Sequence, residues 1–202
     1  MGLENVSKDK IIQGIRKSFD NAVELLSEAD ILSEKNKWAR AYTLCQLAIE
    51  ELAKITLLFN LLIDKINGYP IDYSDCNTQF MDHALKTKLS IETEMFFFQL
   101  YKKETGQDWI DNVIKKGEEF ISKIYELNDL KNESLYVSII GNTFQSPNEI
   151  ISKEAYDNIR ATAILRKIMF DNFVKGAEKN IEEIARIIKE KNEKENGEDE
   201  TS

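Results

Sequence analysis

Apolar residues recur every three or four positions along most of the chain, which is the spacing of one face of an α-helix. Gly68 with Pro70, Gly106, and Gly141 with Pro147 separate the chain into four blocks that each keep this spacing. The pattern predicts long helices over residues 11–29, 38–66, 79–103, 108–130 and 152–188, with a polar link over residues 67–78 between the second and the third. Ser152 is the expected N-cap of the last one.

The block from Trp38 to Ile66 is apolar on almost every side of the predicted helix. A helix of this kind belongs at the centre of a bundle or of a dimer, because no face of it favours water. The run Met95-Phe96-Phe97-Phe98 adds more apolar surface than one bundle face is expected to bury. Both features favour a homodimer.

Two segments do not fit the helical pattern. Residues 136–147 contain Val137, Ile139 and Ile140, which predict an extended segment, although the sequence offers no clear partner strand. Residues 190–202 are polar and acidic with no apolar face, and we expect them to form a disordered tail. The predicted fold is therefore an all-α bundle of about five long helices in one domain, residues 1–189, followed by this tail.

Composition excludes several classes of protein. The formal net charge of −9, from 27 basic and 36 acidic residues, disfavours binding to duplex DNA. The longest apolar stretch, residues 44–63, contains several charges, each of which would cost about 3 kcal/mol at the centre of a bilayer, so we expect no membrane span. Cys45 and Cys76 stand in unrelated contexts, and no signal-peptide pattern opens the chain. We therefore expect a reducing, cytoplasmic location.

Common catalytic motifs are absent from the sequence. It has no glycine-rich phosphate loop and no cysteine pair at zinc spacing. His83 is the single histidine, which excludes the paired Glu-x-x-His motifs of di-iron bundles. We accordingly expect no metal and no nucleotide cofactor.

Charged residues interrupt the central apolar block at Glu50, Glu51 and Lys54. On a helix Glu50 and Lys54 are neighbours at i,i+4, and Gln46 extends them into a narrow polar stripe. One interpretation is an exposed helix edge with an ion pair worth about 0.5 kcal/mol. The other is that buried charges mark a functional site, because unpaired burial costs several kcal/mol.

A second group of polar residues lies where the third long helix is expected to begin. His83 and Lys86 share one helix face at i,i+3, and a helix N-terminus adds positive potential. Such a place suits a phosphate, and the imidazole can transfer protons near neutral pH. The alternative is an ordinary surface histidine.

A third group, Lys131, Asn132 and Tyr136, lies where the fourth long helix is expected to end. Lys131 and Tyr136 are about 140° apart on a regular helix, so they converge only if the helix unwinds or a second subunit intervenes. The alternative is a helix C-terminus with Tyr136 packed in the core.

These motifs together resemble the AbiV family of phage abortive-infection proteins, a family within the HEPN superfamily of helical bundles. The resemblance runs from about residue 12 to 173 in matching order. It is carried by Arg40-Ala41-Tyr42, by Ala48-Ile49-Glu50-Glu51-Leu52-Ala53-Lys54, by His83-x-x-Lys86, and by Leu130-Lys131-Asn132-x-x-Leu135-Tyr136-Val137.

The resemblance implies a dimer and, in many HEPN proteins, a metal-independent ribonuclease that acts as a toxin. The usual HEPN motif is Arg, four to six residues, then His, and here Lys131 and Tyr136 stand in those places. Lysine lacks the forked geometry of arginine, and tyrosine is a poor base at neutral pH. His83 is therefore the candidate to replace the missing histidine, or else the nuclease activity has lapsed.

We therefore expect a cytoplasmic, homodimeric antiphage effector that shuts down translation or cleaves RNA after phage infection. The candidate catalytic residues are His83, Lys131, Asn132 and Tyr136, lining a groove between subunits, with Glu50, Glu51, Lys54 and Lys86 in support. The candidate RNA-binding residues are Lys86, Lys88 and Lys131.

Expected partners are a second copy of the chain, a phage-encoded trigger protein and RNA or the ribosome, with no membrane and no DNA. The alternative is a non-catalytic helical dimer that senses a phage protein and binds RNA, the ribosome or a host factor. A scaffold that holds a small ligand among its aromatic residues is a third possibility, for which the sequence indicates no polar anchor.

Overall fold

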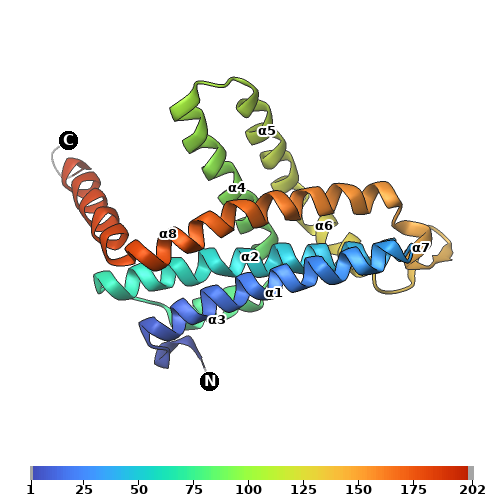
Figure 1. Ribbon diagram of the computed structural model, residues 1–202, viewed down its shortest axis with the longest axis horizontal. Coiled ribbons are helices and arrows are strands. Elements are labelled where there is room, and N and C mark those ends of the chain that lie inside the picture. The colour runs from blue at the N-terminus through green and yellow to red at the C-terminus, as the bar shows by residue number, and fades with distance from the viewer. Residues whose placement is uncertain (1, 200–202) are drawn as a thin grey trace.

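The computed structural model describes residues 2–199, and the side chains of these residues except 177 and 194–199. The chain forms an all-α bundle with one small β-hairpin (Figure 1), which confirms the predicted fold class. In order, its elements are η1 (Leu3–Asn5), α1 (Lys8–Glu34), α2 (Trp38–Asn67), α3 (Tyr73–Met81), α4 (His83–Thr105), α5 (Trp109–Ser122), α6 (Ile124–Glu133), β1 (Ser138–Ile140), β2 (Thr143–Gln145), α7 (Pro147–Ile150) and α8 (Lys153–Asp199).

Helix α2 is the centre of the bundle. It runs beside α1 and α8 along the long axis of the molecule (Figure 1) and also contacts α4 and α6. Its buried side chains lie on every side of the helix, as the apolar pattern predicted, and Leu52, Ile55 and Leu62 are among the most deeply buried. In the described part of the chain, no helix has the length and apolar character needed to cross a membrane.

The boundary between α3 and α4 differs from the prediction of one helix over residues 79–103 after a polar link. Asp82 ends α3 in an extended conformation (φ −77°, ψ 111°) and also caps the next helix, because its side chain accepts a hydrogen bond from the Leu85 backbone N–H. The chain therefore turns at Asp82, and His83 becomes the first residue of α4. The residues expected to form a link contain a helix of their own, α3.

The prediction of one helix over residues 108–130 is also wrong, because α5 and α6 meet at Lys123 with a non-helical backbone (φ −110°, ψ 22°).

The extended segment predicted after α6 folds back on itself and forms both strands of a hairpin. Strands β1 and β2 pair antiparallel across Gly141, whose positive φ of 63° allows the tight turn. Both strands of the hairpin lie within residues 138–145, so β1 pairs without a strand from elsewhere in the chain.

Helix α8 begins as predicted, since the Ala155 backbone N–H donates to the Ser152 hydroxyl at 3.1 Å. It bends at Asn180 (φ −128°, ψ 18°) and continues through Asp199. The helix thus extends into the segment for which we predicted disorder, with ion pairs from Arg186 to Glu183 and Glu190 along its surface. The rest of that segment, residues 200–202, lies outside the described residues.

Helices α4 and α5 form an arm that rises away from the long axis of the bundle (Figure 1). The buried residues of α4 are Lys86, Thr87, Ser90 and Ile91, so only its first half belongs to the core. In the arm, a Cβ on Gly117 would lie 2.5 Å from the Met95 sulfur, so any other residue there would require the Met95 side chain to move.

Candidate functional site

Glu50 is a charged residue in the core of the bundle, with its side chain 3% exposed. Its Oε1 accepts a hydrogen bond from Lys131 Nζ at 2.9 Å, and its Oε2 forms an ion pair with Lys86 Nζ at 3.4 Å. Oε2 is also hydrogen-bonded to Nδ1 of His83. Three helices, α2, α4 and α6, therefore meet at one carboxylate, and we call these four residues the Glu50 cluster.

The two lysines of the Glu50 cluster are nearly as buried as the carboxylate, with side chains 5% and 8% exposed. Burial of an ammonium group is expensive unless a counter-charge is close, and Glu50 supplies one. One carboxylate faces two ammonium groups, so the cluster has an excess of positive charge before His83 is counted. This excess suits a site that receives an anion.

His83 is the part of the Glu50 cluster that solvent can reach, because its side chain is 53% exposed. Its Nδ1 faces the Glu50 carboxylate, which accepts the N–H and thereby favours the tautomer with a free lone pair on Nε2. Nε2 is then available to take up a proton. A carboxylate that orients an imidazole in this way is a recurring arrangement in proton-transfer sites.

A hydrogen bond that the sequence did not indicate links the end of α6 to α2 at this site, through the Ser134 and Thr43 hydroxyls. The Ser134 hydroxyl donates to the Lys131 carbonyl at 2.5 Å and lies 2.5 Å from the Thr43 hydroxyl, with both side chains buried. Serine is common just after the end of a helix, so the sequence alone does not distinguish Ser134. The fold shows that its hydroxyl connects the Lys131 carbonyl to Thr43 on α2 and so fixes the position of Lys131.

The remaining residues of the polar stripe on α2 behave differently from Glu50. Lys54 pairs with Glu51 at 2.5 Å and lies over the Phe80 ring, 5.8 Å from its centroid. The expected Glu50–Lys54 pair is therefore not formed, because the Glu50 side chain turns toward α4 and α6. The interpretation of the stripe as an exposed edge is also wrong, since Gln46 is 3% exposed.

Besides Glu51 and Lys54, three further predicted site residues lie outside the Glu50 cluster. Lys88 is partly exposed and pairs with Glu92 at 3.5 Å along α4. Asn132 is exposed, and Tyr136 is 67% exposed, so the alternative of a core tyrosine is wrong. Helix α6 ends at Glu133, and Tyr136 lies between it and β1, with an exposed side chain where that of Lys131 is buried. One chain thus joins His83 to Lys131 through Glu50 without Tyr136 and without a second subunit.

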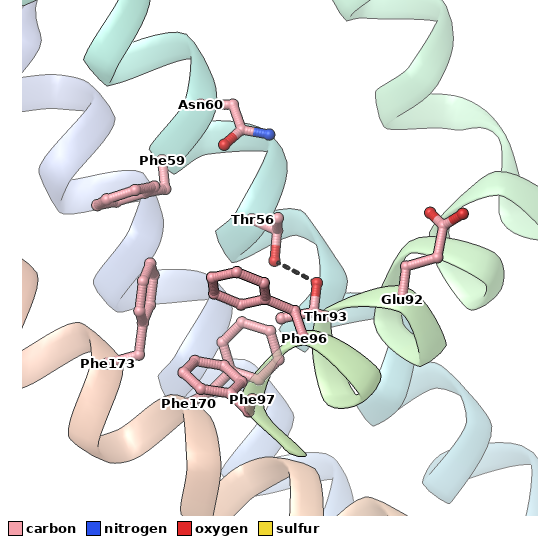
Figure 2. Close-up of a pocket in the computed structure, with 9 residues that line it drawn as sticks. All are labelled: Thr56, Phe59, Asn60, Glu92, Thr93, Phe96, Phe97, Phe170 and Phe173. Carbon is pink, nitrogen blue, oxygen red and sulfur yellow. Dashed lines mark hydrogen bonds between the residues drawn. The ribbon is translucent and has the colours of Figure 1, made fainter. Parts of the chain in front are cut away.

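A groove lined by aromatic side chains lies apart from the Glu50 cluster, between α2, α4 and α8 (Figure 2). Its volume is about 360 Å³, and the rings of Phe59, Phe97 and Phe173 line it with edge-to-face contacts at 4.6 and 6.1 Å. The Thr56 and Thr93 hydroxyls are hydrogen-bonded at 3.2 Å in its wall. Phe96 is 55% exposed at its edge, so the run of aromatic residues that suggested a dimer does leave apolar surface uncovered.

The structure shows no arrangement of residues suited to a metal within the part of the chain that it describes. No group of three or more His, Cys, Asp or Glu side chains there is placed to hold an ion.

Comparisons with known proteins point to one family. The model of the HEPN_AbiV family (AbiV) matches residues 10–166. The chain is also similar to the human EF-hand calcium-binding domain-containing protein 13, at 28% identity over 139 residues. That match covers 62% of this chain but 14% of the human protein. No solved structure matches the chain. Since the family match spans most of the chain and every residue of the Glu50 cluster, this protein belongs to the AbiV family of HEPN abortive-infection proteins.

Proposed function

We propose that this protein is a cytoplasmic abortive-infection effector that cleaves RNA without a metal ion after phage infection. The observation that carries the proposal is the exposed His83 ring held by a buried carboxylate beside two buried lysines. RNA cleavage needs a group that takes a proton and a positive field for the phosphate, and the Glu50 cluster offers both.

In the proposed reaction His83 Nε2 takes the proton from a ribose 2′-hydroxyl. The 2′-oxygen then forms a bond to the adjacent phosphorus, and the bond from phosphorus to the 5′-oxygen of the next nucleotide breaks. The 5′-oxygen takes up a proton from water, and the protonated His83 ring later returns its proton to water. One fragment then ends in a 2′,3′-cyclic phosphate and the other begins with a 5′-hydroxyl. Lys86 and Lys131 provide positive potential, while Glu50 orients the ring.

The test is to incubate the purified protein with single-stranded RNA and with ribosomes in the presence of EDTA, with and without phage proteins as triggers. We expect fragments that end in 2′,3′-cyclic phosphate. RNA that stays intact under all of these conditions would contradict the proposal.

A second candidate function is a non-catalytic one, in which the protein binds RNA, the ribosome or a host factor after sensing a phage protein. The burial of Lys86 and Lys131 favours it, because both ammonium groups are already occupied by Glu50. RNA that is bound but not cleaved would support this candidate instead.

We also propose a homodimer, in which a second copy covers apolar surface of the arm. Large apolar side chains on α4 and α5 are 41–55% exposed, namely Phe96, Leu100, Tyr101, Trp109 and Phe120. Apolar exposure of this extent on two neighbouring helices is typical of a protein interface.

Phe96→Lys is expected to convert this dimer into a monomer, because it places a charge in the centre of the apolar contact. The fold should be retained, since Phe96 is 55% exposed in the single chain. Analytical ultracentrifugation distinguishes the two species, and Phe144→Lys, a change at a residue 73% exposed on β2, serves as the matched control. A wild-type protein that sediments as a monomer of 23.4 kDa would refute the dimer.

A further inference from the structure

A second cavity, of about 250 Å³, lies next to the Glu50 cluster between α2, α4, α8 and the α5–α6 segment. Aliphatic side chains form much of its wall, including Ile49 and Ile91, and Phe120 lies at its exposed edge. Its buried polar residues are Tyr42, Gln46, Thr87 and Arg166, each less than 7% exposed. An apolar cavity with a few converging polar groups is the usual form of a small-molecule site.

Several polar groups of this cavity have hydrogen-bond donors or acceptors that no other described residue uses. Arg166 has five N–H donors, and in the described part of the chain it uses one of them, from Nε to Glu94 at 2.7 Å. The Gln46 amide donates to the Thr87 hydroxyl at 3.0 Å, which leaves its carbonyl oxygen available. Among the described residues, none is hydrogen-bonded to the Tyr42 hydroxyl. Burial raises the pKa of Tyr42 to about 12, so this hydroxyl remains a donor at neutral pH.

Charge and size restrict what this cavity can hold. Glu94 already neutralises Arg166, so the remaining guanidinium donors suit a neutral acceptor such as a ring carbonyl better than a full anion. The volume is below the roughly 300–1,000 Å³ of sites for drug-sized ligands, which leaves room for one ring system. The exposed Phe120 ring at the edge offers a surface for stacking.

The position of the cavity connects it to the Glu50 cluster. The hydrogen bond between Gln46 and Thr87 lies in its wall, one helical turn from Glu50 along α2 and one turn from His83 along α4. One turn is about 5.4 Å, which is comparable with the separation between the base and the phosphate of one nucleotide. A ring bound in the cavity would therefore have its sugar and phosphate close to His83.

We propose that this cavity binds one unpaired nucleobase of the RNA and thereby selects the nucleotide that is cleaved. The donors of Arg166 and Tyr42 bind ring acceptors, the Gln46 carbonyl accepts from a ring N–H or amino group, and Phe120 stacks on the base. The identification of the ring as part of an RNA rests on the proposed function. The cavity itself is tested with free nucleosides.

The experiment is to titrate the full chain with adenosine, guanosine, cytidine and uridine, monitored by calorimetry or NMR. We expect one nucleoside to bind more tightly than the other three. Thr162→Leu, which fills the cavity from α8, should lower its affinity at least about tenfold. Tyr42→Phe, which removes one hydroxyl and leaves the shape unchanged, should lower it about fivefold.

Thr56→Leu is the matched control, because the same substitution then fills the aromatic groove of Figure 2 and should leave nucleoside affinity unchanged. The inference is overturned if no nucleoside binds at about 10 mM, or if the folded Thr162→Leu protein binds as well as the wild type. Selective nucleoside binding supports it even when RNA stays intact, an outcome that contradicts the cleavage reaction alone. Cleavage without base preference, unaffected by Thr162→Leu, contradicts the cavity's role and leaves the reaction at His83 intact.

Discussion

Replacement of His83 by alanine is expected to lower the rate of RNA cleavage by about 10²–10⁴-fold, the usual contribution of a positioned proton-transfer group. The ring is the exposed member of the Glu50 cluster, and nothing else there can exchange a proton with a bound ribose as readily. The measurement is the initial rate of fragment formation from labelled RNA under EDTA.

His83→Asn separates a catalytic role from a structural one. The asparagine amide can still donate a hydrogen bond to Glu50, so the fold should be preserved, but it cannot transfer the proton. We expect this variant to be as inactive as His83→Ala and nearly as stable as the wild type. Tyr125→Ala, at a residue 76% exposed on α6, controls for general damage and should keep full activity. Cleavage that survives in both His83 variants would remove His83 from the mechanism.

Glu50→Ala is expected to lower the free energy of unfolding by about 3–5 kcal/mol. The substitution leaves the Lys86 and Lys131 ammonium groups buried without their shared carboxylate, and it removes the acceptor of the His83 hydrogen bond. Urea denaturation at neutral pH measures the change. A loss below about 1 kcal/mol would mean that the lysines find water or other partners, and that the cluster is less buried than its geometry indicates.

The neighbouring residue provides a matched control for Glu50. Glu51 pairs with Lys54, and their side chains are 18% and 21% exposed. Glu51→Ala should therefore lower the free energy of unfolding by no more than about 1 kcal/mol. A triple variant, Glu50→Leu with Lys86→Met and Lys131→Met, should recover most of the lost stability, because apolar groups of similar size replace all three buried charges. Recovery of stability without recovery of cleavage would show that the charges serve function rather than folding.

Local spacing explains why most of the helices could be predicted. The period of three to four residues in the block around Leu52 results from the geometry of the helix itself and needs no information about neighbours. The turn at Asp82 and the break at Lys123 were missed for the same reason. Neither contains proline or glycine, and each depends on how the next helix packs against the bundle.

The Glu50 cluster was only partly predictable. The i,i+3 spacing placed His83 and Lys86 on one face, and the charges within an apolar block marked Glu50 as unusual. That these residues meet Lys131 depends on side-chain directions at positions 33 and 81 residues from Glu50. The same limit explains the error at Tyr136, whose exposure follows from the end of α6 and the start of the hairpin.

Periodicity and motif order are properties of the chain alone, and they were sufficient to predict the all-α class, the central helix and the resemblance to the AbiV family. The three-dimensional arrangement of the helices was needed to show which charges are buried, which of the two ring nitrogens of His83 faces Glu50, and where the two cavities lie. Burial and contact are set by several helices at once, and the free energy of a charge depends on those neighbours rather than on its place in the sequence.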